Sequence, residues 1–359
     1  MRGVPTATRV SSGRRQRPTL QVLALLTALV AAFSKLWIQG AVVLDGQGAT
    51  LYARLLSDYL IHRGRIPYWI PEVWSGTPGW ALAPSFPLML LLPLTSMAGP
   101  DVALKVGVLA FQVIGGLGAY VLARSLWGRG PGPVLAGIFY ALHPMIVSHG
   151  ALVGLEPILG VTAATPWLMW SFRLALLGGG RKYVVVGALS AAFAVLHQAE
   201  YALCLPLMCG FMLLVELAHS REDPVHGTPG QVLKRAGAIV GLGLALCAFW
   251  LLPLGSLRNS FVLSPPELVQ AELTGGTANL ISNNMGTFFN RPGSITGVVS
   301  HQRPDLVPPL CYLGLVCAAM TMVTLFLLPR RDRDGHLTAI MAASGMAVWF
   351  STGSVPLIA

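Results

Sequence analysis

The most informative feature of this 359-residue sequence is how little charge it carries. Only 11% of its residues are Asp, Glu, Lys or Arg, whereas a soluble domain has about 25%. Hydrophobic residues make up 54% of the chain. This balance excludes a disordered chain, a nucleic-acid-binding module and an ordinary soluble enzyme. Because the longest segments between apolar runs are only 44–102 and 256–307, a soluble catalytic domain fused to membrane spans is excluded as well.

Cysteine is also scarce, and its placement excludes two further kinds of site. A disulfide framework or a zinc site needs cysteines presented in loops at suitable spacing. Here all the cysteines lie within apolar runs, so we interpret them as small apolar residues of helices. They are Cys204, Cys209, Cys247, Cys311 and Cys317.

What the chain does contain is a series of apolar runs long enough to cross a bilayer. A helix rises 1.5 Å per residue, so about 20 residues cross roughly 30 Å of hydrocarbon. The sequence therefore predicts an all-α, polytopic transmembrane helical bundle with about nine spans in this chain. The runs are 20–43, 103–123, 133–149, 157–178, 183–197, 202–218, 236–255, 308–329 and 337–359.

The two ends of the chain fit this organisation. Residues 1–18 carry five arginines and precede a run that is longer than the apolar core of a cleaved signal peptide. We expect a basic cytoplasmic N-terminus, a retained first helix and a transmembrane domain over 19–359. Since the last run has no loop after it, we also expect the C-terminal part of the protein to be missing.

The distribution of Lys and Arg orients the runs. If the proline-rich run 81–98 does not cross, one side carries 16 of the 24 cations: five N-terminal arginines and eleven in the loops 124–129, 173–182, 219–235 and 330–334. If it crosses, that side keeps only nine. The positive-inside rule makes the basic side cytoplasmic, with 81–98 a re-entrant or interfacial element on the outer face. The basic excess then reflects orientation and anionic lipid, not nucleic acid.

The first outer loop, 44–102, contains an amphipathic pattern. In GATLYARLLSDYLIH, apolar residues recur every four positions, and Arg54, Asp58 and His62 form a polar stripe at the same spacing. This pattern is typical of a helix lying in the membrane interface. Asp58 has basic neighbours four residues away on each side, which favours a solvated helix face, with a functional role as the alternative.

Acidic and histidine side chains gather on the predicted outer face. Asp45 lies just past the first run, Glu156 follows His149 in a turn, and His197 and Glu200 are three residues apart. Ionisable residues near membrane depth indicate a functional site. The alternatives are structural: Asp45 could cap a helix, Glu156 could stabilise the first turn of a helix, and His197 and Glu200 could satisfy each other.

The order of motifs over roughly residues 20–220 resembles the C-class membrane glycosyltransferase superfamily. It is most similar to the YfhO-like and 6-pyruvoyl-tetrahydropterin synthase-related bacterial membrane proteins. The motifs are Asp45 after the first helix, the Gly-x-Ile-Pro-x-Trp and Gly-x-Pro sequences at 64–69 and 76–78, Ala-x-x-Pro at 141–144, and then Glu156.

The resemblance implies transfer of a sugar from a polyprenyl-phosphate donor, usually with inversion, in the bacterial plasma membrane. It places the role of catalytic base or metal-contacting acid on Asp45, with Glu156 as a second acidic group. Several branches have paired acids in the first loop, whereas Gly46 and Gln47 follow Asp45 here. No cofactor is therefore required, and a divalent metal is possible.

Two hypotheses follow for the function. In the first, the protein is a glycosyltransferase in which Asp58, His62, Arg63, Arg65, His149, His197 and Glu200 bind substrate, the arginines facing the phosphate. In the second, it is a non-catalytic membrane protein or carrier that handles lipid-linked glycans. A carrier places ionisable groups near the bilayer midplane, whereas here they gather at one face, which favours the enzyme. The loop 256–307 is either an acceptor-binding lid or a disordered outer loop.

Overall fold

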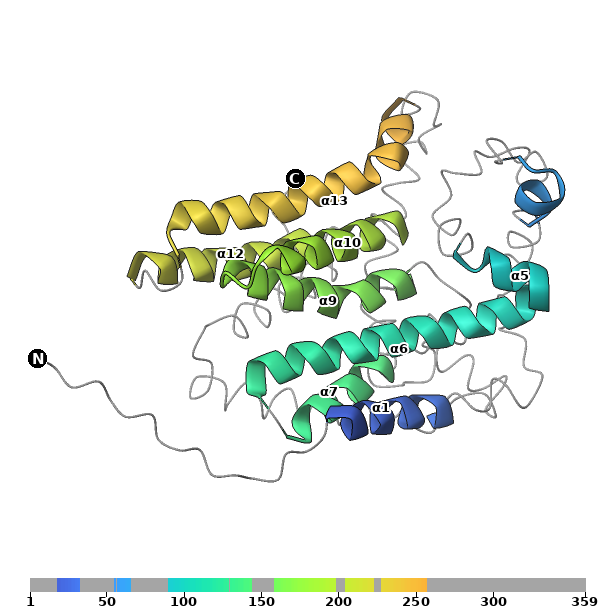
Figure 1. The fold of residues 1–359 in the computed structure, drawn as a ribbon, viewed down its shortest axis with the longest axis horizontal. Coiled ribbons are helices and arrows are strands. Elements are labelled where there is room, and N and C mark those ends of the chain that lie inside the picture. Colours follow the sequence, from blue (N-terminus) through green and yellow to red (C-terminus); the bar gives the residue numbers. More distant parts are fainter. Residues whose placement is uncertain are drawn as a thin grey trace, which may run out of the picture.

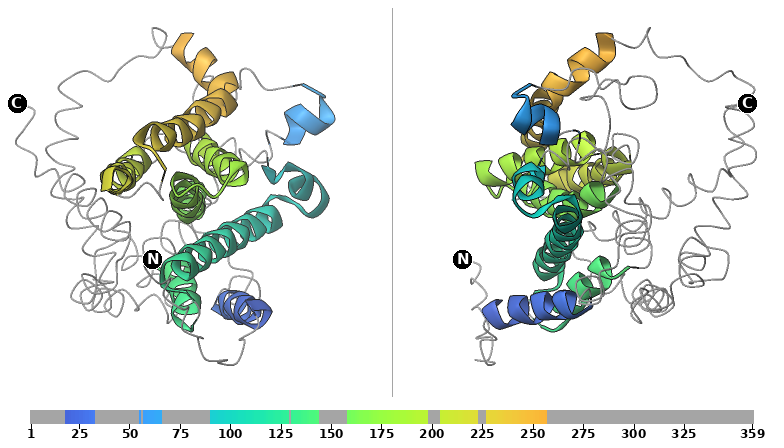
Figure 2. Two further views of the ribbon diagram at one scale, coloured as in Figure 1. Left: turned by 60° about the vertical axis from the view of Figure 1, so that its left-hand side comes forward. Right: turned by 90° about the vertical axis from the view of Figure 1, so that its right-hand side faces the viewer.

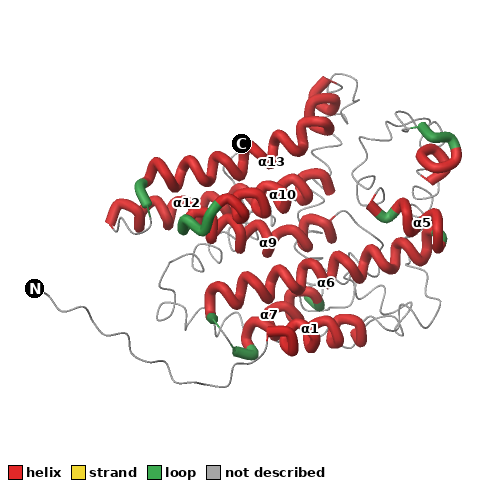
Figure 3. The backbone as a smooth tube through the Cα atoms, in the orientation of Figure 1, coloured by secondary structure: helices red, strands yellow, loops and turns green. Residues whose placement is uncertain are grey.

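The structure, a computed structural model, describes residues 18–32, 55, 57–65, 90–128, 130–143, 158–197, 204–222 and 227–256. Within these ranges every regular element is helical and no strand occurs (Figures 1 and 3). The all-α prediction is confirmed for this part of the chain. The elements are α1 (Pro18–Ala32), η1 (Asp58–His62), α5 (Leu92–Ala98), α6 (Pro100–Trp127), α7 (Gly132–Ala141), α9 (Ile158–Leu176), α10 (Arg181–His197), α12 (Cys204–Glu222) and α13 (Pro229–Ser256).

Two of the described helices are long and apolar enough to cross a membrane, the segments Val102–Trp127 of α6 and Pro229–Leu252 of α13. Five other predicted runs contain helices that are shorter or less apolar. The runs 308–329 and 337–359 lie outside the described residues. The coarse prediction of apolar, span-length helices therefore holds, and the number of nine spans stays a prediction.

The run 81–98 is described only from residue 90 onward. Its helix, α5, has seven residues and so rises only about 10 Å. Gly99, with φ of 85°, separates α5 from α6, and a positive φ of this kind favours glycine. Leu91 and Leu92 pack against the core beside α6. The described half of the run is thus too short to span a bilayer by itself, and the placement of the whole run 81–98 stays a prediction.

The long helices alternate in direction along the chain, so that α1, α7, α10 and α13 start at one end of the bundle and α6, α9 and α12 start at the other. Gln21 Nε2 donates to the carbonyl of Gly130 at 3.0 Å, which joins the start of α1 to the start of α7. Arg235 Nη1 donates to the carbonyl of Leu176 at 2.7 Å, which joins the start of α13 to the end of α9. We call this end of the bundle the basic end. The described parts of the loops predicted to be cytoplasmic lie there.

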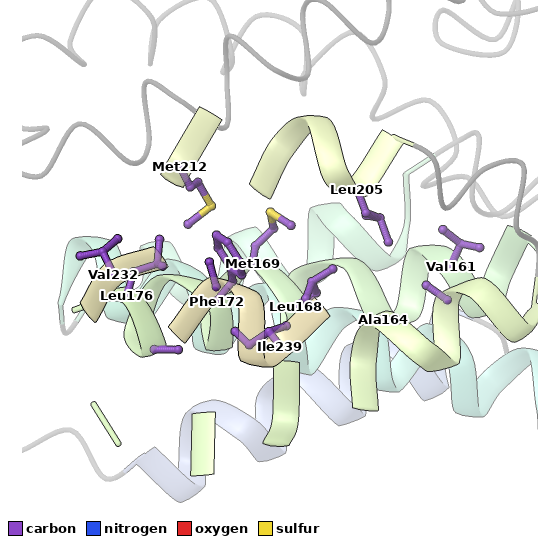
Figure 4. Close-up of a cluster of buried hydrophobic side chains, with 13 residues drawn as sticks. Val161, Ala164, Leu168, Met169, Phe172, Leu176, Leu205, Met212, Val232 and Ile239 are labelled. Carbon is purple, nitrogen blue, oxygen red and sulfur yellow. The ribbon is translucent and has the colours of Figure 1, made fainter. Parts of the chain in front are cut away.

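We call the opposite end of the bundle the site end. It holds the ends of α1, α7, α10 and α13 and the starts of α6, α9 and α12. The packing of α12 on α9 shows which helix ends lie together. Leu205, near the start of α12, and Val161, near the start of α9, lie toward one end of their cluster. Met212 lies farther along, toward Val232 and Leu176 at the basic end (Figure 4). In Figures 1 and 2, α6 runs between the pair α1 and α7 and the group α9, α10, α12 and α13.

An interior proline is accommodated by a neighbouring helix. Pro166 lies inside α9 and cannot donate to the carbonyl four residues earlier, which belongs to Thr162. Tyr140 of α7 supplies the missing donor, with its hydroxyl 2.6 Å from that carbonyl. The indole of Trp167 donates to the carbonyl of Ile114 in α6 at 2.9 Å. These two bonds hold α6, α7 and α9 in register at the level of the proline.

Candidate functional site

The candidate site is the site end, because helix ends that adjoin the predicted ionisable residues meet there. Asp45 follows α1 in the chain, and His149 and Glu156 lie in the segment between α7 and α9. Glu200 comes three residues after the end of α10. These four residues lie outside the described residues, so their convergence stays a prediction.

His197 is described, and it is part of the core. It is the last residue of α10 and is 0% exposed. Its Nδ1 lies 2.7 Å from the carbonyl oxygen of Phe193. The ring of Phe111 from α6 stands perpendicular to the imidazole at 5.3 Å, and that of Phe193 lies at 4.0 Å. The imidazole thus joins α6 to α10 at the site end.

The packing around His197 leaves no room on the α9 side. A Cβ added at Gly160 would overlap the imidazole. Glycine at this position is therefore what lets α9 approach the histidine. The sequence prediction placed His197 in a turn that binds substrate; the structure places it, fully buried, at the end of α10 between α6 and α9.

Asp58 lies on η1, a single wide helical turn in the first predicted outer loop. Its carboxylate pairs with Arg63 Nη2 at 2.6 Å, and Arg63 N donates to the carbonyl of Asp58 at 2.9 Å. The sequence placed its basic neighbours four residues away, at Arg54 and His62. The wide turn brings the residue five positions later to the carboxylate instead.

The basic residues at the end of η1 and just after it are accessible. Arg63 lies over the ring of Tyr59 at 4.5 Å, and His62, Arg63 and Arg65 are all exposed. An exposed ion pair contributes at most about 1 kcal/mol, so Arg63 can exchange the carboxylate of Asp58 for a phosphate at little cost. Figure 1 shows η1, in blue, beyond α5 and the start of α6.

The described residues contain no group of three or more His, Cys, Asp or Glu that could hold a metal ion. Asp58, His62 and His197 therefore do not form a metal centre with one another. Asp45, which the resemblance makes a base or a metal-contacting acid, and Glu156, the second acidic group, lie outside the described residues.

Sequence reasoning missed Gln112, which lies in the apolar run of α6. Its side chain is 2% exposed and has no hydrogen-bond partner for either amide atom within the described part of the chain. The available signal was a carboxamide inside a transmembrane run followed by Gly115 and Gly116. A buried polar group of this kind calls for an explanation.

No protein-family model matches this chain, and no curated protein matches it either.

Proposed function

We propose that the protein is a membrane glycosyltransferase. It transfers a sugar from a polyprenyl-phosphate donor to a lipid, glycan or protein acceptor at the outer face of the bacterial plasma membrane. The observation that carries the proposal is that the ends of α1, α7 and α10 and the start of α9 share the site end. Asp45, Glu156 and Glu200 adjoin these helix ends in the sequence, and the described cationic loop residues lie at the opposite end.

The membrane assignment is supported by exposed apolar side chains along α13. Hydrophobic residues on this helix are exposed along most of its length, which suits contact with lipid tails rather than water. The five most exposed are Leu233, Val240, Leu244, Phe249 and Leu252.

The proposed reaction is a single displacement at the anomeric carbon. Asp45 removes the proton of the acceptor hydroxyl, the hydroxyl oxygen bonds to the anomeric carbon, and the bond from that carbon to the phosphate oxygen breaks. Polyprenyl phosphate leaves with the electron pair, and the anomeric configuration inverts. Arg63 and Arg65 bind the phosphate through charge-assisted hydrogen bonds, and Glu156 is the second acidic group.

A carrier of lipid-linked glycans is the second candidate, and one observation favours it. Arg173 and Glu216 are charged residues buried within the described bundle, at 7% and 1% exposure. Buried charges in a membrane protein commonly mark a transport path. Both residues, however, lie within two turns of the basic end of α9 and α12, whereas a carrier places them near the midplane.

The two candidates are separated by an assay on the purified full chain. It is incubated with a panel of polyprenyl-phosphate sugars, and the released polyprenyl phosphate and the glycosylated acceptor are measured. The proposal predicts stoichiometric formation of both products. Binding of the donors without release of polyprenyl phosphate, combined with their movement across vesicle membranes, would instead establish the carrier.

A further inference from the structure

Cationic side chains gather at the basic end, where α10 and α13 begin. Arg181 and Lys182 are the first two residues of α10, and Lys234 and Arg235 lie in the second turn of α13. The first three are exposed, and Arg235 is half-buried. Among the described residues none of these cations has an ion pair with a carboxylate. We call the four residues the basic patch.

Arg235 brings the two parts of the basic patch together. Its Nη1 donates to the carbonyl of Leu176, at the end of α9. A Cβ added at Gly178, in the turn from α9 to α10, would lie 3.4 Å from both Nη1 and Nη2 of Arg235. The turn that leads to Arg181 therefore lies against the second turn of α13.

The packing of α10 on α13 places the two lysines at the same height. The two helices lie side by side and both begin at the basic end (Figure 1). A Cβ added at Gly187 of α10 would lie 3.3 Å from Cδ1 of Ile239 in α13. Lys182 and Lys234 each lie five residues before this contact, so they are level along the bundle.

The positions of these cations are unfavourable within the protein itself. The start of a helix is the positive end of its dipole, which favours acidic side chains and disfavours basic ones. Neither α10 nor α13 has an acid in its first turn. The sequence segments 173–182 and 219–235 together contain six Lys or Arg and only two acids. The charge that gathers here therefore favours an anion from outside the chain.

The surroundings of the basic patch favour an anion that carries an apolar tail. Nζ of Lys182 lies 4.9 Å from the centre of the Tyr183 ring, and tyrosine is enriched at the level of lipid headgroups. Within two turns of the lysines, both helices expose apolar side chains: Val185 and Leu189 on α10, and Val240 on α13. A soluble anion would contact the charges alone, whereas a phospholipid would contact both surfaces.

We propose that the basic patch binds the phosphate of an anionic phospholipid in the leaflet at the basic end, with the acyl chains along α10 and α13. Basic residues at the membrane surface attract anionic lipid. Gly178 and the two glycines after it are exposed, so a headgroup can approach the backbone of this turn closely. Such binding rests on the membrane assignment and is independent of sugar transfer.

Three probes separate the charge of the lipid from its apolar tail. They are phosphatidylglycerol, phosphatidylcholine with the same acyl chains, and glycerol 3-phosphate. Each is added to the full chain, delipidated in a neutral detergent, and the Kd of the first bound molecule is measured by native mass spectrometry. Thermal unfolding without added lipid is measured in the same detergent.

Two triple variants that lose the same charge are compared with wild type. Arg235 is kept in both, because it binds the carbonyl of Leu176. The patch variant carries Arg181→Gln, Lys182→Gln and Lys234→Gln. The control variant loses three cations of the N-terminal segment, through Arg9→Gln, Arg14→Gln and Arg15→Gln. Both lose positive charge from the predicted cytoplasmic side, but only one loses it at the basic patch.

We expect the patch variant to bind phosphatidylglycerol about 10–100-fold more weakly than wild type, because three cations that face the headgroup are lost. The control variant should bind it within about twofold of wild type, since its charges lie elsewhere. Phosphatidylcholine and glycerol 3-phosphate should bind all three proteins weakly. The lipid-free unfolding temperature of the patch variant should be no lower than that of wild type, because the lost cations oppose the helix dipoles.

Four results would overturn the proposal. An equal loss of affinity in both triple variants would mean that any basic segment attracts the lipid. Equal affinity for phosphatidylcholine and phosphatidylglycerol would remove the role of the headgroup charge, and tight binding of glycerol 3-phosphate would make the patch a site for a soluble anion. A lower lipid-free unfolding temperature in the patch variant would show that its cations have partners within the protein. Since no sugar donor is present, none of these results tests the proposed transfer reaction.

Discussion

At the residue scale, the proposed reaction assigns the role of base to one carboxylate, that of Asp45. Asp45 is the acid nearest the first helix in the chain, has no basic neighbour within four residues, and is followed by Gly46. In the proposed reaction this carboxylate accepts the proton of the acceptor hydroxyl. The two possible roles of Asp45 can be told apart by removing its charge. A base needs the charge, whereas a helix cap does not.

We expect Asp45→Asn to lower the turnover of sugar transfer by about 10²–10⁴-fold, the usual contribution of a general base. Asn caps a helix nearly as well as Asp, so expression and unfolding temperature should be unchanged. The measurement is initial rate in detergent with the best donor of the panel. Near-normal turnover would remove Asp45 from the mechanism and make Asp58 the next acid to test.

Pro166 offers a second test at this scale, because its missing donor is replaced by Tyr140. We expect Tyr140→Phe to destabilise the protein by about 1–3 kcal/mol, since the carbonyl of Thr162 loses its partner. In a Pro166→Ala background the helix itself can supply an N–H to that carbonyl. In that background, Tyr140→Phe should lower the free energy of unfolding by less than it does in wild type. The measurement is the unfolding of wild type, the two single variants and the double variant, which form a double-mutant cycle. Equal costs in both backgrounds would contradict this account.

At the scale of elements, close approach of helices depends on glycine. A Cβ added at Gly118 would lie 2.8 Å from the Trp167 ring and 2.9 Å from Pro166 Cγ. The glycine thus allows α6 to contact α9 where the indole of Trp167 donates to Ile114. Small residues have this role generally in membrane helix packing.

We expect Gly118→Ala to destabilise the protein by about 1–3 kcal/mol, because the added methyl group must push α9 away. Gly241→Ala is the matched control, since a Cβ there meets nothing within 4 Å. Alanine is the better helix former, so the control should be neutral or slightly stabilising. The readout is thermal unfolding in one detergent. Equal effects of the two substitutions would contradict a close contact of α6 with α9.

At the scale of the whole molecule, the two ends of the bundle differ in charge. Arg124, Arg173, Arg181, Lys182 and Arg235 lie in or beside the described loops of the basic end. By the positive-inside rule we propose that this end is cytoplasmic and that the site end faces outward.

We expect a membrane-impermeant maleimide to label His62→Cys but not Trp127→Cys in intact cells, and both after permeabilisation. His62 is exposed on η1, and Trp127, at the basic end of α6, is 48% exposed. Wild type, with its native cysteines, gives the background. Labelling of Trp127→Cys in intact cells would reverse the topology and place the site end in the cytoplasm.

The sequence alone determined the helical class, most helix positions and the grouping of loops at two ends. A helix that crosses lipid must be long and apolar, and the positive-inside rule depends on the charges of each loop. Both are local properties, so each can be predicted from one segment of the sequence without its neighbours in space. Helix limits were less predictable. The run 236–255 became α13, Pro229–Ser256, because Arg235 inside its first turns binds the carbonyl of Leu176, a contact with another helix.

Only the tertiary structure decided which polar groups have partners. The pairing of Asp58 with Arg63, the bond from Tyr140 to Thr162 and the packed imidazole of His197 all depend on local turn width or on neighbouring helices. The burial of Gln112 without a partner is likewise a property of how α6 meets α1, α7 and α9. Hydropathy averages over a window of residues and carries no information about what a particular side chain faces across a helix interface.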